Sequence, residues 1–240
     1  MPEPVRRPSP TLNHPLMGAD LRTLCVGLFG NGALPPAAWP LVAALVASAL
    51  ARSPFTLAEG LYARARRRRL PPSPPPVFIL GHWRSGTTHL FNLMSRDPRF
   101  AWVDPIASGM PNDFLLLGRL LRPVLARALP EDRYIDNIPV HLDSPQEDEI
   151  GLASMQDVSY YHAMYFPRRF ESHFEAGLFH DGLGPAQLAR WRATVRDYAE
   201  RLLVARPGAT LLVKNPVYTG LVGQLREIWP EARFVHIYRN

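Results

Sequence analysis

The chain has 240 residues, and 27 lysine and arginine residues against 21 acidic residues give it a formal net charge of +6. Hydrophobic residues make up 47% and charged residues 20%, which excludes general disorder. The length fits one α/β domain, or a small domain plus an appendage. A single cysteine, Cys25, excludes a disulfide framework and a cysteine-rich zinc module. The positive charge suits a polyanionic ligand, an anionic membrane or nucleic acid, and does not choose among them.

The N-terminal part, residues 1–70, is expected to be a helical segment. Residues 1–13 are polar and lack the apolar core of a cleavable signal peptide. Apolar stretches follow at 21–29 and 38–50; the second is short for a membrane span and predicts a buried or interfacial helix. A further helix at 57–65 leads into four arginines at 66–69. This segment could rest on an anionic membrane surface, or it could pack on the main domain with its arginines in water.

A proline-rich run, LPPSPPP at residues 70–76, predicts a stiff linker and the boundary of a second domain. Beyond it, strand and helix patterns alternate, which predicts an α/β fold with a parallel central sheet and right-handed crossovers. The expected strands are 77–80, 100–103, 211–213 and 234–238. The expected helices are 88–94, 114–129, 149–157, 188–205 and 221–229.

The segment VFILGHWRSGTTHL, residues 77–90, predicts an anion-binding loop between a strand and a helix. Backbone N–H groups at such a helix start attract phosphate, and threonine hydroxyls can add to them. The glycine spacing copies a Walker A loop, but Thr87 stands where that loop has lysine, and the basic residue is Arg84. The late strand is followed by Arg239 rather than by a carboxylate for Mg²⁺. This pattern favours a ligand with two phosphates and no metal over ATP.

Lysine usage singles out one further position. Lys214 is the only lysine among the 27 basic residues. This solitary lysine predicts a site that needs a compact ammonium rather than a planar guanidinium, unless it survived by chance.

Four segments together resemble the PAPS-dependent sulfotransferase family: HWRSGTTHL, DSPQEDEIGL, LLVKNP and FVHIYRN. The resemblance covers residues 75–240 and is closest to the bacterial branch and to the Golgi and tyrosylprotein-type members. It implies a P-loop-like three-layer fold and metal-independent, in-line transfer of a sulfuryl group from PAPS to an acceptor hydroxyl or amine, with 3′,5′-ADP as product. The family pattern continues past residue 240, so residues 75–240 are expected to be the N-terminal part of that domain, incomplete at its C-terminus. The resemblance places part of the cofactor site beyond residue 240, so this fragment is expected to lack activity on its own.

The resemblance also implies roles for individual residues. Lys214 would act on the bridging oxygen or the transferring sulfuryl group, and Arg239 would bind the 3′-phosphate. His89 lies where many members have a tryptophan near the adenine. The residues implied for the 5′-phosphosulfate are Arg84, Ser85, Gly86, Thr87 and Thr88.

The general base is left open between two places. Glu147 and Glu149 lie in SPQEDE, although Ser144 and Glu147 also fit a helix capping box with Pro145 at the first helical position. Asp104 is the alternative base, or else a turn residue before Pro105. An aromatic stretch at 160–166 either lines the acceptor pocket or belongs to the core.

Two rival functions remain at this point: a P-loop nucleotide kinase or other phosphotransferase, and a non-catalytic nucleic-acid-binding protein that uses the arginines at 64–69. The sulfotransferase interpretation expects no nucleic-acid partner and no metal ligands. Its acceptor could be a small molecule, a sugar, a lipid or a peptide, and its location is expected to be cytoplasmic or peripheral to the membrane.

Overall fold

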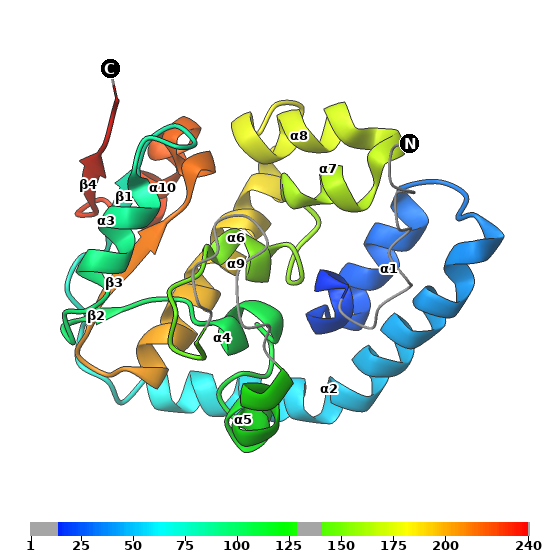
Figure 1. The fold of residues 1–240 in the computed structure, drawn as a ribbon, viewed down its shortest axis with the longest axis horizontal. Helices are drawn as coiled ribbons and strands as arrows, with labels where there is room; N and C mark the ends of the chain where they lie inside the picture. The colour runs from blue at the N-terminus through cyan, green and yellow to red at the C-terminus, as the bar shows by residue number, and fades with distance from the viewer. Residues whose placement is uncertain (1–13, 129–140, 240) are drawn as a thin grey trace, which may run out of the picture.

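The structure is a computed structural model that describes residues 14–128 and 141–239 (Figure 1). Its four strands are β1 (Val77–Leu80), β2 (Phe100–Ala101), β3 (Thr210–Lys214) and β4 (Arg233–His236). Its α-helices are α1 (Leu21–Gly30), α2 (Trp39–Arg67), α3 (Thr87–Met94), α4 (Pro105–Gly109), α5 (Leu117–Ala128), α6 (Asp148–Leu152), α7 (Tyr161–Tyr165), α8 (Phe170–Phe179), α9 (Pro185–Ala205) and α10 (Val222–Ile228). Short 3₁₀ turns include η1 (Pro15–Gly18) and η4 (Pro216–Gly220).

The four described strands form one parallel sheet in the order β2-β3-β1-β4, which confirms the predicted α/β class. In the register of β1 and β3, Ile79 lies opposite Lys214. Because all strands run the same way, their carboxyl ends share one edge of the sheet. Lys214, at the end of β3, therefore lies beside the loop that follows β1.

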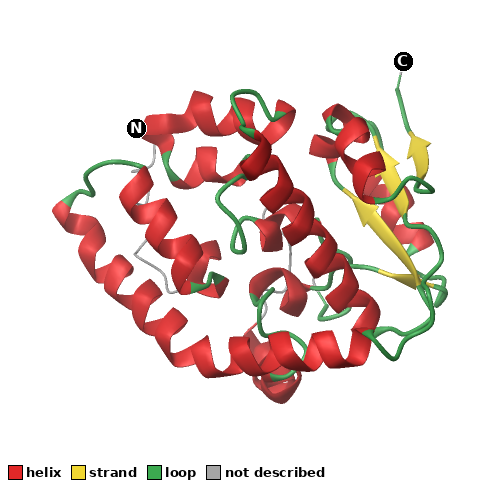
Figure 2. Ribbon diagram, turned by 180° about the vertical axis from the view of Figure 1, so that it is seen from behind, coloured by secondary structure: helices red, strands yellow, loops and turns green. Residues whose placement is uncertain are grey.

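Alternate side chains of β1 enter two different cores, as expected for a strand. Val77 and Ile79 pack with Phe91 of α3 on one face of the sheet. Phe78 and Leu80 pack on the other face in the main core, which also contains residues of α9 and α10. The sheet is thus covered on both faces, and the predicted three-layer arrangement is confirmed (Figure 2).

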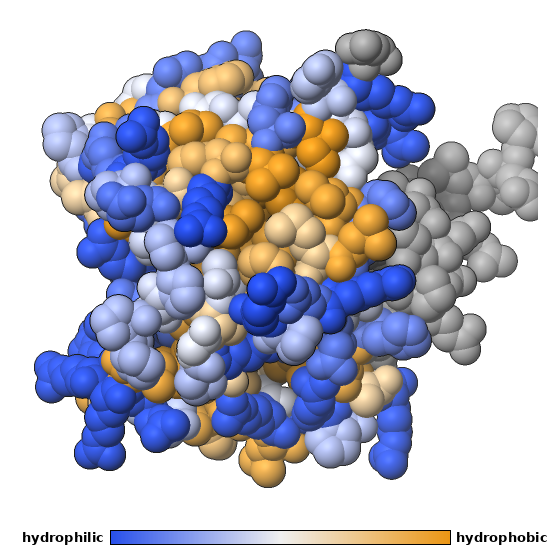
Figure 3. Space-filling view, turned by 90° about the vertical axis from the view of Figure 1, so that its left-hand side faces the viewer, coloured by the Kyte–Doolittle hydropathy of each residue, from blue (hydrophilic) through white to orange (hydrophobic). Residues whose placement is uncertain are grey.

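The edge strand β4 is exposed along most of its length. Figure 3 views the molecule from this side and shows a broad apolar area over the region of β4 and α3. Leu93 of α3 and Val235 of β4 are among the exposed large hydrophobic residues of the protein.

The apolar stretches at 38–50 and 57–65 belong to one helix, α2, so the expectation of two separate helices is wrong. Pro54 lies inside α2 and removes one backbone hydrogen bond, but two buried charges fasten the helix on either side of it. Arg52 forms an ion pair with Asp113, and Glu59 accepts a hydrogen bond from the Leu116 amide at 2.9 Å. These long-range contacts are invisible to a local pattern.

Other element bounds differ from prediction for local reasons. The strand expected at 100–103 stops at Ala101, because Asp104 caps α4 and Val103 pairs instead with Gln146 in an isolated antiparallel bridge. Helix α6 ends at Leu152 rather than at residue 157. Helix α5 begins at residue 117, and residue 129 of the predicted helix lies outside the described residues, as does the segment 1–13. Helices α7 and α8 were not predicted.

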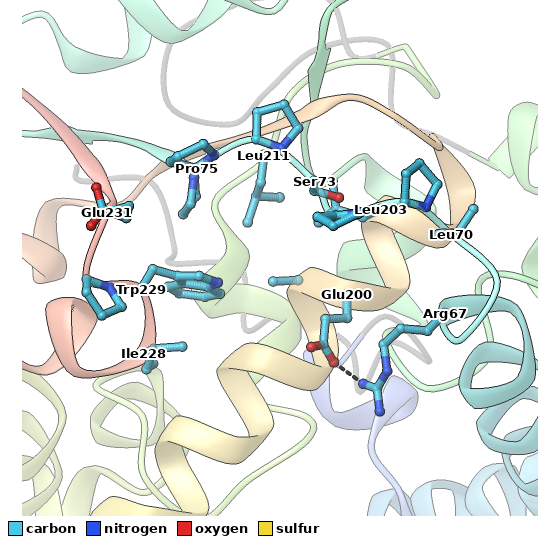
Figure 4. A pocket seen from close by; sticks show the side chains of 16 residues that line it. Arg67, Leu70, Ser73, Pro75, Glu200, Leu203, Leu211, Ile228, Trp229 and Glu231 are labelled. Carbon is cyan, nitrogen blue, oxygen red and sulfur yellow. Dashed lines mark hydrogen bonds and ion pairs between the residues drawn. The ribbon is translucent and has the colours of Figure 1, made fainter.

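The proline-rich run at 70–76 lies over α9 and beside Trp229, with a cavity of about 550 Å³ beneath it (Figure 4). The ion pair between Arg67 and Glu200 lies at one side of this cavity. Pro76 directly precedes β1 and accepts a hydrogen bond from the Arg233 amide at 2.9 Å. This cavity is therefore at the amino edge of the sheet, opposite the loop that follows β1.

Candidate active site

The loop after β1 turns sharply and then starts α3. Gly81, Arg84 and Gly86 have φ angles of 149°, 65° and 104°. A Cβ on Gly81 would lie 2.4 Å from the Ile237 carbonyl oxygen, so that position requires glycine. Gly86 is the N-cap of α3 and has no side chain to occupy the helix start, which leaves the first amides of α3 open to an anion. The predicted glycine-bounded turn between a strand and a helix is present.

Hydrogen bonds hold the loop in this shape. The Ser85 amide and hydroxyl both donate to the His82 carbonyl oxygen, at 3.2 and 2.8 Å. The Gly81 amide donates to the hydroxyl of Thr219 in η4 at 3.0 Å. Because Thr219 follows β3, this contact ties the loop to the segment that carries Lys214.

A cavity of about 570 Å³ opens in front of the loop. It brings together residues from the loop, the segment before α6, the end of β3 and the end of the described chain. Its lining residues are Trp83, Arg84, Gly86, Thr87, Thr88, Phe91, Pro145, Gln146, Glu147, Ile150, Tyr161, Lys214, Pro216 and Arg239. A neighbouring cavity of about 340 Å³ shares Trp83, Arg84 and Arg239 with it and is also lined by Ser85. Most of the predicted site residues therefore gather at one place.

Lys214 forms an ion pair with Glu147, and both face the larger cavity. The Lys214 side chain is 6% exposed and that of Glu147 is 21% exposed. The two residues are 67 positions apart in the chain, and the sequence analysis gave them separate roles. Their pairing places a carboxylate and the only lysine of the chain side by side at the carboxyl edge of the sheet.

The capping-box interpretation of Glu147 is wrong. Glu147 is itself the N-cap of α6, without a capping side-chain hydrogen bond, and the Ser144 hydroxyl accepts instead from the His141 amide at 2.9 Å. The helix starts late because the Gln146 amide donates to the Val103 carbonyl oxygen at 2.8 Å, which keeps the chain extended up to Glu147. The Glu147 side chain is thereby directed to Lys214 rather than to the helix backbone.

Two buried carboxyl groups lie directly behind this pair. Asp148 accepts hydrogen bonds from the Tyr218 hydroxyl and, at 3.1 Å, from the Asn215 amide group, which also lies 3.4 Å from Glu149. Burial raises the pKa of Asp148 to about 7, and burial together with the charge of Asp148 raises the pKa of Glu149 to about 8. Glu149 is not among the residues that line the cavity. The network joins α6 to the residue that follows Lys214.

Asp104 and His89 lie apart from the cavity. Asp104 caps α4, its carboxylate accepting from the Ala107 amide at 2.8 Å, and it lines a separate cavity with Arg122 and Arg206. Burial raises the pKa of Asp104. His89 is exposed on α3 and is absent from the residues lining either site cavity.

Sequence reasoning missed the contribution of Trp83 and left Tyr161 undecided between core and pocket; both line the cavity. Tyr161 could have been found only by knowing that α7 returns to the carboxyl edge of the sheet. Among residues 14–128 and 141–239, no group of three or more His, Cys, Asp or Glu side chains is placed to hold a metal ion.

Comparison with solved structures shows the same fold. The crystal structure of sulfotransferase STF9 from Mycobacterium avium matches with a TM-score of 0.51 and 17% sequence identity. The match covers 76% of this chain and 47% of that chain.

Comparison of sequences gives the family. Two curated relatives, both named omega-hydroxy-beta-dihydromenaquinone-9 sulfotransferase Stf3, come from Mycobacterium tuberculosis and Mycobacterium bovis. Each is 32% identical over 166 residues, or 69% of this chain, and the chain spans about two fifths (42%) of the length of these relatives. The model of the sulfotransferase family matches residues 75–240, the part that carries the loop, Glu147, Lys214 and Arg239. The chain belongs to the sulfotransferase family.

Proposed function

We propose that the cavity in front of the loop binds PAPS and that the chain's residues promote transfer of its sulfuryl group to an acceptor hydroxyl or amine. The observation that carries this proposal is the Lys214–Glu147 pair, which faces the same cavity as the anion-binding loop and Arg239. A cation for the leaving group and a carboxylate for the acceptor proton are the two groups that sulfuryl transfer needs.

The lining residues suit a nucleotide with phosphate groups at the 5′ and 3′ positions of its ribose. The start of α3, the hydroxyls of Thr87 and Thr88, and Arg84 would hold the 5′-phosphosulfate. Arg239 lines both cavities and would bind the 3′-phosphate with its planar guanidinium. Exposed Trp83 offers an apolar surface between the two cavities.

In the proposed reaction, the acceptor oxygen forms a bond to sulfur as the bond from sulfur to the phosphate oxygen breaks. Glu147 takes the proton of the acceptor hydroxyl, and the phosphate leaves with the electron pair of the broken bond. Lys214 stabilises the negative charge that grows on the leaving oxygen. Of the three candidate bases, Glu147 is the one that lines the cavity, so we assign the proton to it rather than to Glu149 or Asp104.

The buried network behind Glu147 would position this machinery. Asn215 follows Lys214 directly and is shared between Asp148 and Glu149, which follow Glu147 directly. Because the amide contacts both carboxyl groups, movement of α6 against β3 would break these contacts. We therefore regard Asp148, Glu149 and Asn215 as positioning residues.

The acceptor that we would test first is a lipid alcohol. The name of the curated relatives places their acceptor hydroxyl on a menaquinone-derived lipid. The residues lining the cavity include Phe91, Ile150 and Tyr161, whose apolar groups would suit the carbon chain next to such a hydroxyl.

Calorimetry of the chain with 3′,5′-ADP and with 5′-AMP tests the nucleotide part of the proposal, because the two ligands differ only in the 3′-phosphate. We expect 3′,5′-ADP to bind about 10- to 100-fold more tightly, the range for one charged hydrogen-bonded contact. Arg239→Gln should remove this preference. Arg233→Gln, which changes an exposed arginine at the start of β4, the strand that precedes Arg239, should keep it. Equal affinity for the two ligands would contradict the assignment.

A further inference from the structure

Over residues 39–61 of helix α2 the charged residues face the interior of the protein and apolar residues face outward, the reverse of a helix surrounded by water. A surface helix normally turns an apolar stripe to the core and polar residues to solvent. In α2, the charged residues between positions 39 and 61 are Arg52 and Glu59, and both are buried. The exposed residues over the same span are all apolar: Trp39, Pro40, Ala43, Ala47, Leu50, Ala51, Pro54, Phe55, Leu57, Ala58 and Leu61. We call this set the outer face of α2.

The outer face is one continuous strip. Trp39, Ala43, Ala47, Leu50, Pro54, Leu57 and Leu61 follow one another at spacings of three or four residues, so they line one side of the helix. At 1.5 Å per residue this strip is about 33 Å long. Trp39, Leu57 and Leu61 are exposed by 57%, 69% and 65%. An apolar strip of this length and exposure indicates an interaction surface.

The inner face explains why α2 is held in this orientation. The Arg52 guanidinium donates to the carbonyl oxygens of Met17 and Ala19, at 2.9 and 2.5 Å, besides pairing with Asp113. Glu59 lies 3.8 Å from Arg201 of α9. Turning the helix to bury its leucines would expose or break these charged contacts, which is costly for buried groups. The fold therefore fixes the apolar side outward.

A cluster of arginines lies at the end of the strip. Arg64, Arg66, Arg68 and Arg69 are exposed, while Arg67 pairs with Glu200. These guanidinium groups could pair with the phosphate headgroups of an anionic bilayer while the neighbouring apolar strip contacts its acyl chains. At the other end of α2, Val26 and Phe29 of α1 are also exposed.

The position of α2 leaves this side of the molecule open. The helix runs along the outer border of the fold, at the right and bottom of Figure 1. The segment 36–67 is long and apolar enough to cross a membrane by length and composition. Only 22% of its most apolar 18-residue stretch is buried inside the protein. Its inner face contacts η1, α1 and α9, so the geometry suits a helix that lies along a membrane surface rather than one that crosses it.

We propose that the outer face of α2, with Arg64, Arg66, Arg68 and Arg69, docks the protein on an anionic phospholipid bilayer. This inference concerns binding only and does not depend on the proposed sulfuryl transfer. If both hold, the docked protein would meet acceptors that are dissolved in the membrane.

The test is sedimentation of the 240-residue chain with vesicles made of equal parts phosphatidylglycerol and phosphatidylcholine, compared with vesicles of phosphatidylcholine alone. We expect the chain to pellet with the anionic vesicles at low salt and to be released at high salt. Binding to the neutral vesicles should be much weaker. A chain that stays in the supernatant with anionic vesicles at low salt would overturn the proposal.

Two sets of variants distinguish the contribution of the leucines to membrane binding from that of the arginines. Leu50→Asn, Leu57→Asn and Leu61→Asn together should weaken the partition coefficient at least about tenfold, because these side chains lose their contact with the acyl region. Arg66→Gln, Arg68→Gln and Arg69→Gln together should weaken binding to anionic vesicles by roughly 100-fold and reduce its salt dependence.

A matched control replaces three exposed apolar side chains on α3, α7 and α8, as Leu93→Asn, Met164→Asn and Phe179→Asn. This control should bind within about twofold of wild type, and circular dichroism should show that every variant is folded. Wild-type binding by the leucine variant would overturn the proposal. So would a wild-type dimer, seen by light scattering, that the leucine variant converts to a monomer, since a second copy of the chain would then cover the face.

Discussion

The Lys214–Glu147 pair should show an asymmetric response when each partner is neutralised. Removing one partner of a fully buried ion pair lowers the free energy of unfolding by about 3–5 kcal/mol, whereas an exposed ion pair contributes about 0.2–1 kcal/mol to it. Here the two partners differ, with 6% of the Lys214 side chain and 21% of the Glu147 side chain exposed. Glu147→Gln leaves the more buried ammonium of Lys214 without a charged partner and should lower the free energy of unfolding by about 2–4 kcal/mol. Lys214→Met leaves a carboxylate that water can reach, and should cost about 1–2 kcal/mol.

The assay is urea unfolding of wild type, both single variants and the double variant. The double variant should recover part of the loss, with a coupling free energy of about 1–2 kcal/mol. The same cycle on Arg67→Met and Glu200→Gln is the control, since that pair is exposed by 43% and 30% and should couple by less than about 1 kcal/mol. If the Lys214 cycle gives no coupling, or if Lys214→Met is the costlier change, the paired geometry does not hold in solution.

Three further outcomes follow from the site. Arg84→Ala should weaken 3′,5′-ADP binding by about 1.5–3 kcal/mol in calorimetry, and a loss of a few tenths would remove Arg84 from the ligand contacts. EDTA should leave 3′,5′-ADP affinity unchanged; a large drop would argue for a metal-dependent site. Glu149 and Asp148 have folded-state pKa values raised to about 8 and about 7, above the usual values of about 4, so the folded state retains their protons. Stability should therefore fall as pH rises from about 5 to 8, by up to about 1.4 kcal/mol per pH unit for each retained proton, and Glu149→Gln should reduce this slope. A urea midpoint that rises between about pH 5 and 8 would contradict the buried positions of Asp148 and Glu149.

Local patterns were sufficient for the parts of the fold that depend on short segments. A four-residue apolar run before a glycine-bounded loop predicted β1 and the start of α3, and both are present. The alternation of strands and helices predicted a parallel sheet, since short connections between parallel strands are sterically excluded. The excess of arginine over lysine singled out Lys214, which the fold places at the carboxyl edge of the sheet.

Features that depend on distant contacts escaped prediction. Nothing near Glu147 in the chain indicates that it pairs with Lys214, and its spacing from Ser144 and Pro145 suggested a capping box instead. The apolar stretches at 38–50 and 57–65 suggested two separate helices, whereas Arg52 and Glu59 hold one helix in place through residues far along the chain. The aromatic stretch at 160–166 reads equally as core or pocket until the fold brings Tyr161 to the cavity.

The most direct test of the proposed chemistry is transfer of radiolabelled sulfur from PAPS to a long-chain alcohol by a full-length family member that carries these residues, because the chain spans 42% of the length of its curated relatives. Wild type should yield the labelled sulfate ester together with an equal amount of 3′,5′-ADP. Lys214→Ala should bind 3′,5′-ADP within a few-fold of wild type yet transfer about 10²–10³ times more slowly, because the lysine acts mainly on the charge of the transition state. Lys214→Arg should recover little of that rate. Transfer by Lys214→Arg at the wild-type rate, or nucleotide binding by wild type with no labelled ester, would contradict the account.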